Sequence, residues 1–237
     1  AAGHGALLMV DGVSSIVSMP FEFDAWGVDL AVTGSQKGFM LPAGLAIVGL
    51  SEKAIAASKT AGLPRTFLSF DDMRKGYAAN AYPYTPAVGL MNGLKLSTGM
   101  LLEEGLDAVY ARHARIADGV RAAVGAWGLA LCAKSPDLYS NTVTAVRTPE
   151  GFDASRIVEV AARDYGMAFG TGLGDVAGQV FRIGHLGMMT DAMALSGLST
   201  VEMVMADLGL DIALGSGVAA AQSVYRHGTQ TERMAAQ

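Results

Sequence analysis

Apolar residues in the first fifty positions form three short runs separated by glycine and polar residues. The runs Leu7–Val10, Val28–Val32 and Gly44–Leu50 have the length of buried β-strands. The third run follows the second too closely for a helical crossover, so we expect those two strands to be antiparallel neighbours. Ser51 then predicts the N-cap of a helix. Between the first two runs, Pro20–Gly27 is typical of a short helix that ends at Gly27.

The pattern changes after this first sheet. Residues 60–86 carry prolines and tyrosines without periodicity, which predicts an irregular loop, and a long loop in a compact domain is usually functional. From Ala87 to about Val124 the apolar positions recur at helical spacing. Gly99 and Gly105 indicate a break or kink in this helical stretch. We therefore place a domain boundary there, with residues 1–104 and 105–237 as the two domains.

The second half alternates between strand and helix patterns. Strands are predicted at Gly128–Cys132, Thr142–Val146 and Gln179–Ile183. Asp153 and Asp191 are each placed as the N-cap of a helix, and a last helix is expected from about Ile212 to Tyr225. This alternation indicates an α+β layer. The predicted fold class is α/β, with a partial mixed-sheet domain followed by a smaller α+β domain.

Composition narrows the class of protein. Hydrophobic residues make up 51% and charged residues 16%, which is typical of a globular chain with a large core. The net charge is −5 and no Lys/Arg run occurs, so a nucleic-acid partner is not expected. No apolar run reaches the length of a membrane span. The single cysteine, Cys132, is predicted to be a buried small hydrophobe in a reducing compartment. Without a targeting signature at either end, the expected location is the cytoplasm.

Two polar side chains at strand ends carry the candidate chemistry. The second strand runs into Val32–Gly38, where Lys37 stands among glycines, and the first strand ends at Asp11. A lysine amine whose surroundings lower its pKa attacks carbonyls and forms a Schiff base. Pyridoxal phosphate needs such a lysine for its aldehyde and an acid for its pyridinium nitrogen. The alternative is a surface lysine in a glycine-rich turn and a strand-end carboxylate in water.

The stretches LLMVDGVSS and WGVDLAVTGSQKGFMLPAGLA closely resemble the class V, fold-type I aminotransferases, and within that class the serine–glyoxylate group. The resemblance covers essentially all 237 residues. It implies that residues 1–104 are the C-terminal portion of a large domain that binds pyridoxal phosphate. It also implies that residues 105–237 are the small C-terminal domain. The N-terminal part of the family pattern is expected to lie outside this sequence.

The resemblance also implies roles for the residues around the lysine. Lys37 is expected to form the Schiff base and to move the proton between the substrate Cα and the cofactor. Asp11 is expected to pair with the pyridinium nitrogen, and Gln36 to bind the cofactor phosphate. Ser35 is a weaker candidate for the phosphate, because side-chain alternation can point it away.

Two further motifs complete the expected site. In the family, a tyrosine and a threonine three positions later reach across a dimer interface to the partner's cofactor phosphate. Tyr82 and Thr85 have that spacing, which implies a homodimer. Arg182 stands between Phe181 and Ile183, and a buried guanidinium needs a partner. Its planar fork suits a carboxylate, and the resemblance implies that it binds the substrate α-carboxylate.

Other polar residues favour structural roles. His185 lies in the turn after the arginine strand and is interpreted as a structural imidazole. Gly170–Gly174 lacks the spacing of a nucleotide-binding loop and is predicted to be a flexible turn. His4, His113 and His227 are scattered without metal-ligand spacing, so no metal is expected.

The expected reaction transfers the amino group of L-serine to glyoxylate, giving hydroxypyruvate and glycine. The reaction class follows from the residues above, whereas the donor follows from the overall likeness to one group. Alanine–glyoxylate and related class V aminotransferases share all of these motifs. A non-catalytic, truncated remnant is the alternative from another class of protein.

Overall fold

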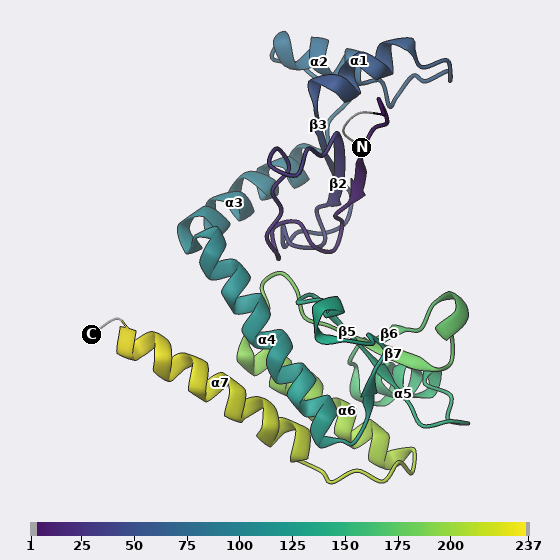
Figure 1. Cartoon of the computed structure of the whole chain (residues 1–237), viewed down its shortest axis with the longest axis vertical. Coiled ribbons are helices and arrows are strands. Elements are labelled where there is room, and N and C mark those ends of the chain that lie inside the picture. The colour runs from purple at the N-terminus through teal and green to yellow at the C-terminus, as the bar shows by residue number, and fades with distance from the viewer. Residues whose placement is uncertain (1–3, 236–237) are drawn as a thin grey trace. The chain divides into compact units, whose positions relative to one another are not determined.

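The computed structural model describes the backbone of residues 4–235 and the side chains of residues 4–227. The chain divides into two compact units, Ala1–Leu106 and Asp107–Gln237, each with its own sheet (Figure 1). We refer to them as unit 1 and unit 2.

The sheet of unit 1 is mixed and has the strand order β1-β2-β3. Strands β1 (Met9–Asp11) and β2 (Leu30–Gly34) are parallel, whereas β3 (Ala46–Leu50) is antiparallel to β2, which confirms the predicted reversal. The prediction that the first strand is buried was wrong: Met9 is 65% exposed. The reason is that β1 is the edge strand of this sheet in the described part of the chain.

Three helices follow the sheet of unit 1: α1 (Glu52–Thr60), α2 (Phe70–Ala78) and α3 (Val88–Glu104). Ser51 accepts a hydrogen bond from the Ala54 N–H, as expected of an N-cap. Helix α2 lies within the stretch predicted to be irregular, so that prediction was wrong in its middle. The Ser69 hydroxyl caps α2 by accepting from the Asp72 N–H, and such local capping starts a helix between proline-rich flanks.

The predicted helix at Pro20–Gly27 is a series of turns instead. The Trp26 N–H donates to the Glu22 carbonyl and the Gly27 N–H to the Asp24 carbonyl, and Gly27 takes a left-handed conformation with φ +64°. The Val28 N–H donates back to the Phe23 carbonyl and closes the turn. The chain therefore leaves the helical path after one turn and enters β2.

Unit 2 holds a four-stranded antiparallel sheet with the order β4-β5-β7-β6. Its elements, in chain order, are α4 (Leu106–Ala126), β4 (Ala130–Leu131), the 3-10 turn η1 (Pro136–Leu138), β5 (Val143–Arg147), α5 (Ser155–Tyr165), β6 (Gly170–Thr171), the 3-10 turn η2 (Gly174–Val176), β7 (Val180–Gly184), α6 (Asp191–Asp207) and α7 (Ser216–Ala235).

Two local predictions for unit 2 need correction. Strand β6 lies inside Gly170–Gly174, which was predicted to be a flexible turn, because Gly170 pairs with Arg182 across the sheet. One of the two predicted N-caps is displaced by one residue, since Thr190, not Asp191, caps α6. At α5 the Asp153 carboxylate accepts from the Ser155 N–H at 2.9 Å, which confirms Asp153 as the residue that caps the helix start.

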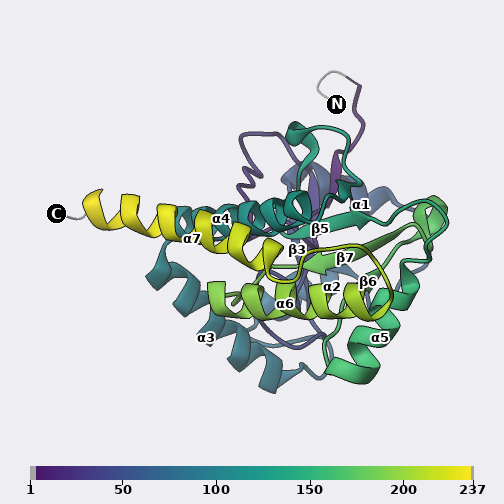
Figure 2. The same cartoon turned by 90° about the horizontal axis from the view of Figure 1, so that it is seen from below.

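The core of unit 2 lies between its helices and one face of its sheet. Helix α7 contacts both α4 and α6, and the three helices run side by side in Figure 2. The core residues come from α4, α5, α6, α7, β5 and β7, and include Ile116, Ile157, Leu198, Tyr225, Val146 and Phe181.

Gly105, with φ +85°, separates α3 from α4, whereas Gly99 lies inside α3 without breaking it. None of the described helices is long and apolar enough to traverse a bilayer.

Candidate active site

The candidate lysine follows β2 in a loop that we call the lysine loop, residues 35–45. Strands β1 and β2 are parallel, and Asp11 at the end of β1 pairs with Val32. The end of β1 and the start of the lysine loop therefore lie at the same edge of the sheet. The structure thus brings Asp11, Gln36 and Lys37 to one edge, where ligands of open α/β sheets collect.

Two glycines shape this edge. A Cβ atom at Gly34 would lie 2.6 Å from Gln36 Oε1, so the Gln36 side chain folds back over Gly34 and would have to shift if a side chain stood there. A Cβ atom at Gly38 would lie 2.5 Å from the Ile16 carbonyl oxygen. The lysine loop therefore packs directly against the segment that follows Asp11. The contact between Gly38 and Ile16 was not predicted from the sequence, although the glycines on either side of Lys37 indicated a close approach of another part of the backbone.

The polar groups at this edge are available to a ligand. Within the described residues, neither Lys37 Nζ nor the Gln36 amide has a hydrogen-bond or ion-pair partner; Lys37 is half-buried and Gln36 exposed. Asp11 uses one carboxylate oxygen to accept a hydrogen bond from the Val13 N–H, 3.0 Å away. An amine, an amide and a carboxylate at one sheet edge are the groups that pyridoxal phosphate requires for its aldehyde, phosphate and ring nitrogen. The residues present therefore fit this cofactor.

Ser35 is turned away from this group of residues. It is fully buried, and its hydroxyl donates to the Pro42 carbonyl at 2.7 Å and accepts from the Leu45 N–H at 3.1 Å. Both hydrogen-bond partners lie within the lysine loop. The Ser35 hydroxyl is therefore engaged inside the loop and is not directed to a phosphate.

Tyr82 and Thr85 lie on an exposed part of unit 1. Tyr82 is 57% exposed, and both residues line a cavity of about 710 Å³. The other walls of this cavity are largely aromatic or apolar, and include Phe67, Tyr77, Tyr84, Pro86 and Met91. This open aromatic surface leaves both side chains free to meet another molecule. A contact with a partner's cofactor stays a prediction.

Arg182 belongs to unit 2 and lies on β7. Its neighbours Phe181 and Ile183 point into the core, so strand alternation places Arg182 on the opposite face of the sheet. It is half-buried there and not fully buried as expected from its neighbours. Its Nε–H donates to the Thr171 carbonyl at 2.8 Å, and the side chain lines a cavity of about 280 Å³ that also includes Thr144. The guanidinium can accept a carboxylate through its remaining N–H groups.

His185 is a satisfied structural imidazole, as predicted. It is fully buried, with Nε2 2.8 Å from Thr144 Oγ1 and Nδ1 3.2 Å from the Asn141 carbonyl oxygen. Burial lowers the pKa of His185 to about 4. The ring is therefore neutral at physiological pH, and both of its nitrogens are used to hold the strand ends together.

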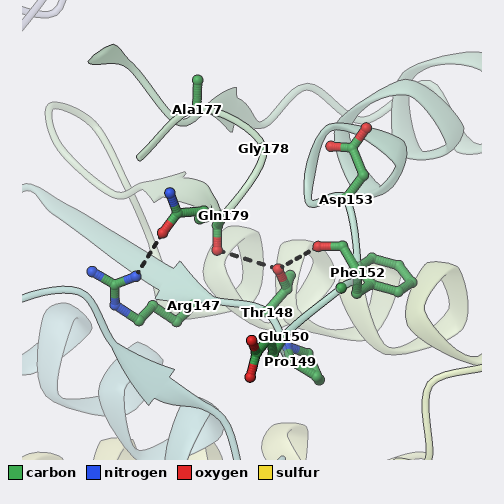
Figure 3. Close-up of a pocket in the computed structure, with 10 residues that line it drawn as sticks. Arg147, Thr148, Pro149, Glu150, Phe152, Asp153, Ala177, Gly178 and Gln179 are labelled. Atoms are coloured by element: carbon green, nitrogen blue, oxygen red, sulfur yellow. Dashed lines mark hydrogen bonds between the residues drawn. The ribbon is translucent and has the colours of Figure 1, made fainter. Parts of the chain in front are cut away.

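A further cavity of unit 2 contains none of the predicted site residues (Figure 3). It measures about 780 Å³ and lies between the β5–α5 turn and the residues before β7. Its polar groups bond to one another: Arg147 donates to Gln179 Oε1, and the Thr148 hydroxyl donates to the Phe152 carbonyl. No group of histidine, cysteine, aspartate and glutamate that could hold a metal occurs among the described residues.

Cys132 differs from its prediction. It is half-buried rather than fully buried, since the short strand β4 lies at the edge of the unit 2 sheet. Its sulfur lies 3.9 Å from a guanidinium nitrogen of Arg147.

Comparison with known proteins places these observations in a family. The family model for class-V aminotransferases matches residues 1–183. The L-aspartate–glyoxylate aminotransferase of Paracoccus denitrificans is 69% identical over 229 residues, which cover 97% of this chain and 58% of that protein. The serine–glyoxylate aminotransferase of Hyphomicrobium methylovorum is 52% identical over 227 residues, covering 95% of this chain and 56% of that protein.

Solved structures of aminotransferases are also similar to this chain. The pyridoxamine–pyruvate aminotransferase from Mesorhizobium loti superposes with a TM-score of 0.88 at 38% identity, covering 95% of this chain and 58% of that one. The present chain thus spans less than three-fifths of the length of these relatives. The likeness confirms the fold-type I architecture and implies pyridoxal phosphate as the cofactor. The chain belongs to the class-V aminotransferase family.

Proposed function

We propose that this protein is a pyridoxal-phosphate-dependent aminotransferase that uses glyoxylate as its amino acceptor. The observation that carries the proposal is the sheet edge of unit 1, where Asp11 ends β1 and Lys37 follows the end of the parallel strand β2. Glyoxylate is the acceptor named for both relatives described above, at 69% and 52% identity.

L-Aspartate is our first candidate for the amino donor, because the relative at 69% identity is an L-aspartate–glyoxylate aminotransferase. L-Serine, the donor expected from the sequence, has the support of relatives at 48–52% identity. L-Alanine is a third candidate, since the motifs are common to the class. The non-catalytic alternative predicts that no donor reacts.

Each candidate residue has a role that its position supports. Bound pyridoxal phosphate supplies an electron-accepting ring that stabilises negative charge at the substrate Cα. The Lys37 amine is the nucleophile towards the cofactor aldehyde and afterwards carries the substrate α-proton. The Asp11 carboxylate keeps the ring nitrogen protonated, and the Gln36 amide N–H donates to the phosphate. The Arg182 fork binds the substrate α-carboxylate with two parallel hydrogen bonds.

A homodimer is the proposed active assembly. Tyr82 and Thr85 lie beside the exposed aromatic residues Phe67 and Tyr77 on unit 1, and a large apolar surface of this kind marks an interaction site. In the dimer, the hydroxyls of Tyr82 and Thr85 would donate to the partner's cofactor phosphate. A cytoplasmic location is the remaining prediction from the sequence.

Absorbance spectroscopy tests the proposed function. Protein loaded with pyridoxal phosphate is expected to show a visible band that L-aspartate bleaches and glyoxylate restores. Bleaching by L-serine or L-alanine instead keeps the class and changes the donor. No band, or a band that is indifferent to all three amino acids, contradicts the proposal and favours the non-catalytic alternative.

The variant Lys37→Ala tests the central residue. It is expected to remove the visible band and to lower kcat by about 10²–10⁴-fold, because the amine that carries the proton is gone. The matched control is Lys59→Ala, in the last turn of α1, which should leave both readouts unchanged. Normal absorbance and activity in Lys37→Ala would exclude Lys37 from the site.

A further inference from the structure

Ser35 joins the sheet of unit 1 to the lysine loop in an unusual way. Strands β2 and β3 are antiparallel, and Gly34 pairs with Ala46 at the end of their ladder. Ser35 and Leu45 extend this ladder by one pair, since the Ser35 N–H donates to the Leu45 carbonyl at 3.1 Å. An ordinary pair would return a hydrogen bond from the Leu45 N–H to the Ser35 carbonyl.

The returning bond goes to the side chain instead. The Leu45 N–H donates to Ser35 Oγ at 3.1 Å, while the Ser35 carbonyl accepts from the Leu41 N–H at 3.0 Å. The hydroxyl thus takes the place of the backbone carbonyl in the ladder. It also donates to the Pro42 carbonyl at 2.7 Å. One buried residue therefore ties together three positions at the far end of the lysine loop.

This substitution of side chain for backbone has a geometric consequence. The Ser35 carbonyl does not pair with β3, because it accepts from the Leu41 N–H instead. The chain therefore turns out of the sheet directly after Ser35. Gln36 and Lys37 are the first two residues beyond that turn. They have no other anchor in their side chains within the described residues. The direction in which they leave the sheet therefore depends on the bonds that Ser35 makes.

We propose that Ser35 is a positioning residue for Lys37: its hydroxyl closes the lysine loop and holds the Lys37 amine at the sheet edge shared with Asp11. The proposal rests on the proposed function, because it assigns Lys37 to the cofactor. Ser35 itself acts through Lys37 and touches neither cofactor nor substrate. Its hydroxyl must both donate and accept, which serine and threonine can do and alanine cannot.

The test uses the variants Ser35→Ala and Ser35→Thr in the holoenzyme. The first readout is amide hydrogen exchange of peptides that contain Leu45. The second is the fraction of cofactor fixed to Lys37, relative to Lys53 and Lys59, after borohydride reduction and peptide mass spectrometry. Two lost hydrogen bonds predict about a tenfold faster exchange at Leu45 in Ser35→Ala, and a similar loss of labelling at Lys37. Ser35→Thr should restore both readouts.

The matched control is Ser58→Ala. Its hydroxyl donates to the Ile55 carbonyl within α1 in the same unit, so its loss should change neither readout. If Ser35→Ala does not fold, Ser35→Cys replaces it, because a thiol is a weak donor and acceptor of similar size.

Three outcomes decide between the alternatives. Faster exchange at Leu45 together with reduced labelling of Lys37 supports the proposal. Faster exchange at Leu45 with unchanged labelling of Lys37 overturns it and leaves Ser35 a purely structural residue. A wild-type protein in which Lys37 is labelled no more than Lys53 overturns the proposed function instead. In that case the exchange data still measure whether Ser35 orders the loop.

Discussion

At the scale of single residues, Gly38 shows how a missing side chain positions the lysine loop. The space beside its Cα is occupied by the Ile16 carbonyl and by Val17, whose Cβ would lie 3.1 Å from an added methyl group. Val17 itself holds a left-handed conformation with φ +73°, which a β-branched residue rarely adopts. The Val17 side of this contact is strained backbone and the Gly38 side has no room for a Cβ atom, so the loop and the segment after Asp11 are closely packed.

Gly38→Ala is therefore expected to destabilise unit 1 by about 1–3 kcal/mol, because the new methyl group overlaps a backbone oxygen that cannot rotate away. The same change should lower the affinity for pyridoxal phosphate, since Lys37 is adjacent. Urea unfolding and a cofactor titration measure the two effects.

Gly99→Ala is the control for this prediction. Nothing lies within 4 Å of the added Cβ in the middle of α3, and alanine is the better helix former. Equal stability of Gly38→Ala and wild type would show that the loop can shift, and would contradict the tight contact.

At the scale of secondary-structure elements, Glu202 joins three helices of unit 2. It is a buried carboxylate on α6 that accepts from Trp127 Nε1–H after α4 at 2.9 Å. It also accepts from the N–H groups of Gly215 and Gly217 at the start of α7, each at 2.7 Å. A negative charge at a helix N-terminus satisfies N–H groups that have no partner within the helix. Gly217 has no room for a side chain, because a Cβ atom would lie 2.3 Å from Trp127 Nε1.

Glu202→Gln is expected to reduce the free energy of unfolding by about 2–3 kcal/mol, since one acceptor becomes a donor that faces other donors. Urea unfolding of the purified chain measures the change. Glu159→Gln, at an exposed position on α5, is the matched control and should have an effect within about 0.5 kcal/mol. A Glu202→Gln variant as stable as that control would mean that the three helices pack without this carboxylate.

At the scale of the whole molecule, the two units differ in how much apolar surface they bury. The continuous buried cluster belongs to unit 2. In unit 1, large apolar side chains are exposed, among them Leu63 at 82% and Tyr77 at 86%. Apolar burial is the main favourable term in folding, so unit 2 is expected to be the more stable unit.

The stability of unit 2 is expected to depend on pH through His185. Its pKa of about 4 in the folded chain lies below the usual 6.5 because of burial, so the unfolded chain binds the proton more readily. The stabilisation is therefore fully present above pH 6.5 and is lost as pH falls towards 4. A pKa difference of this size corresponds to roughly 3 kcal/mol.

Trp127, buried in unit 2, reports this unfolding by fluorescence once the only other tryptophan, Trp26, is replaced by phenylalanine. The urea concentration at the unfolding midpoint is expected to be lower at pH 4 than at pH 7. The variant His185→Gln, whose side chain cannot titrate, should show a smaller difference between the two pH values. An unchanged difference in His185→Gln would assign the pH dependence to other groups.

Features that depend on neighbouring residues were predictable from the sequence alone. The β2–β3 reversal, the Ser51 cap and the glycine-flanked lysine are encoded within a few positions, because turn and cap geometries involve only adjacent backbone groups. The N-cap of α2 at Ser69 also involves only nearby residues, but it was not predicted because the prolines and tyrosines around it indicated an irregular loop. The likeness of two stretches to one family supplied the assignment of the candidate residues.

Tertiary structure decided the features that depend on distant partners. Strand pairing placed Arg182 on the face opposite the core, although its neighbours Phe181 and Ile183 had suggested burial. The Ser35 hydroxyl is turned into the lysine loop because Leu45 and Pro42 return beside it. The direction of a side chain follows from which backbone groups are already paired, and that pairing exists only once the strands have met. The likeness to one family names the candidate residues; the folded sheet determines where each of them points.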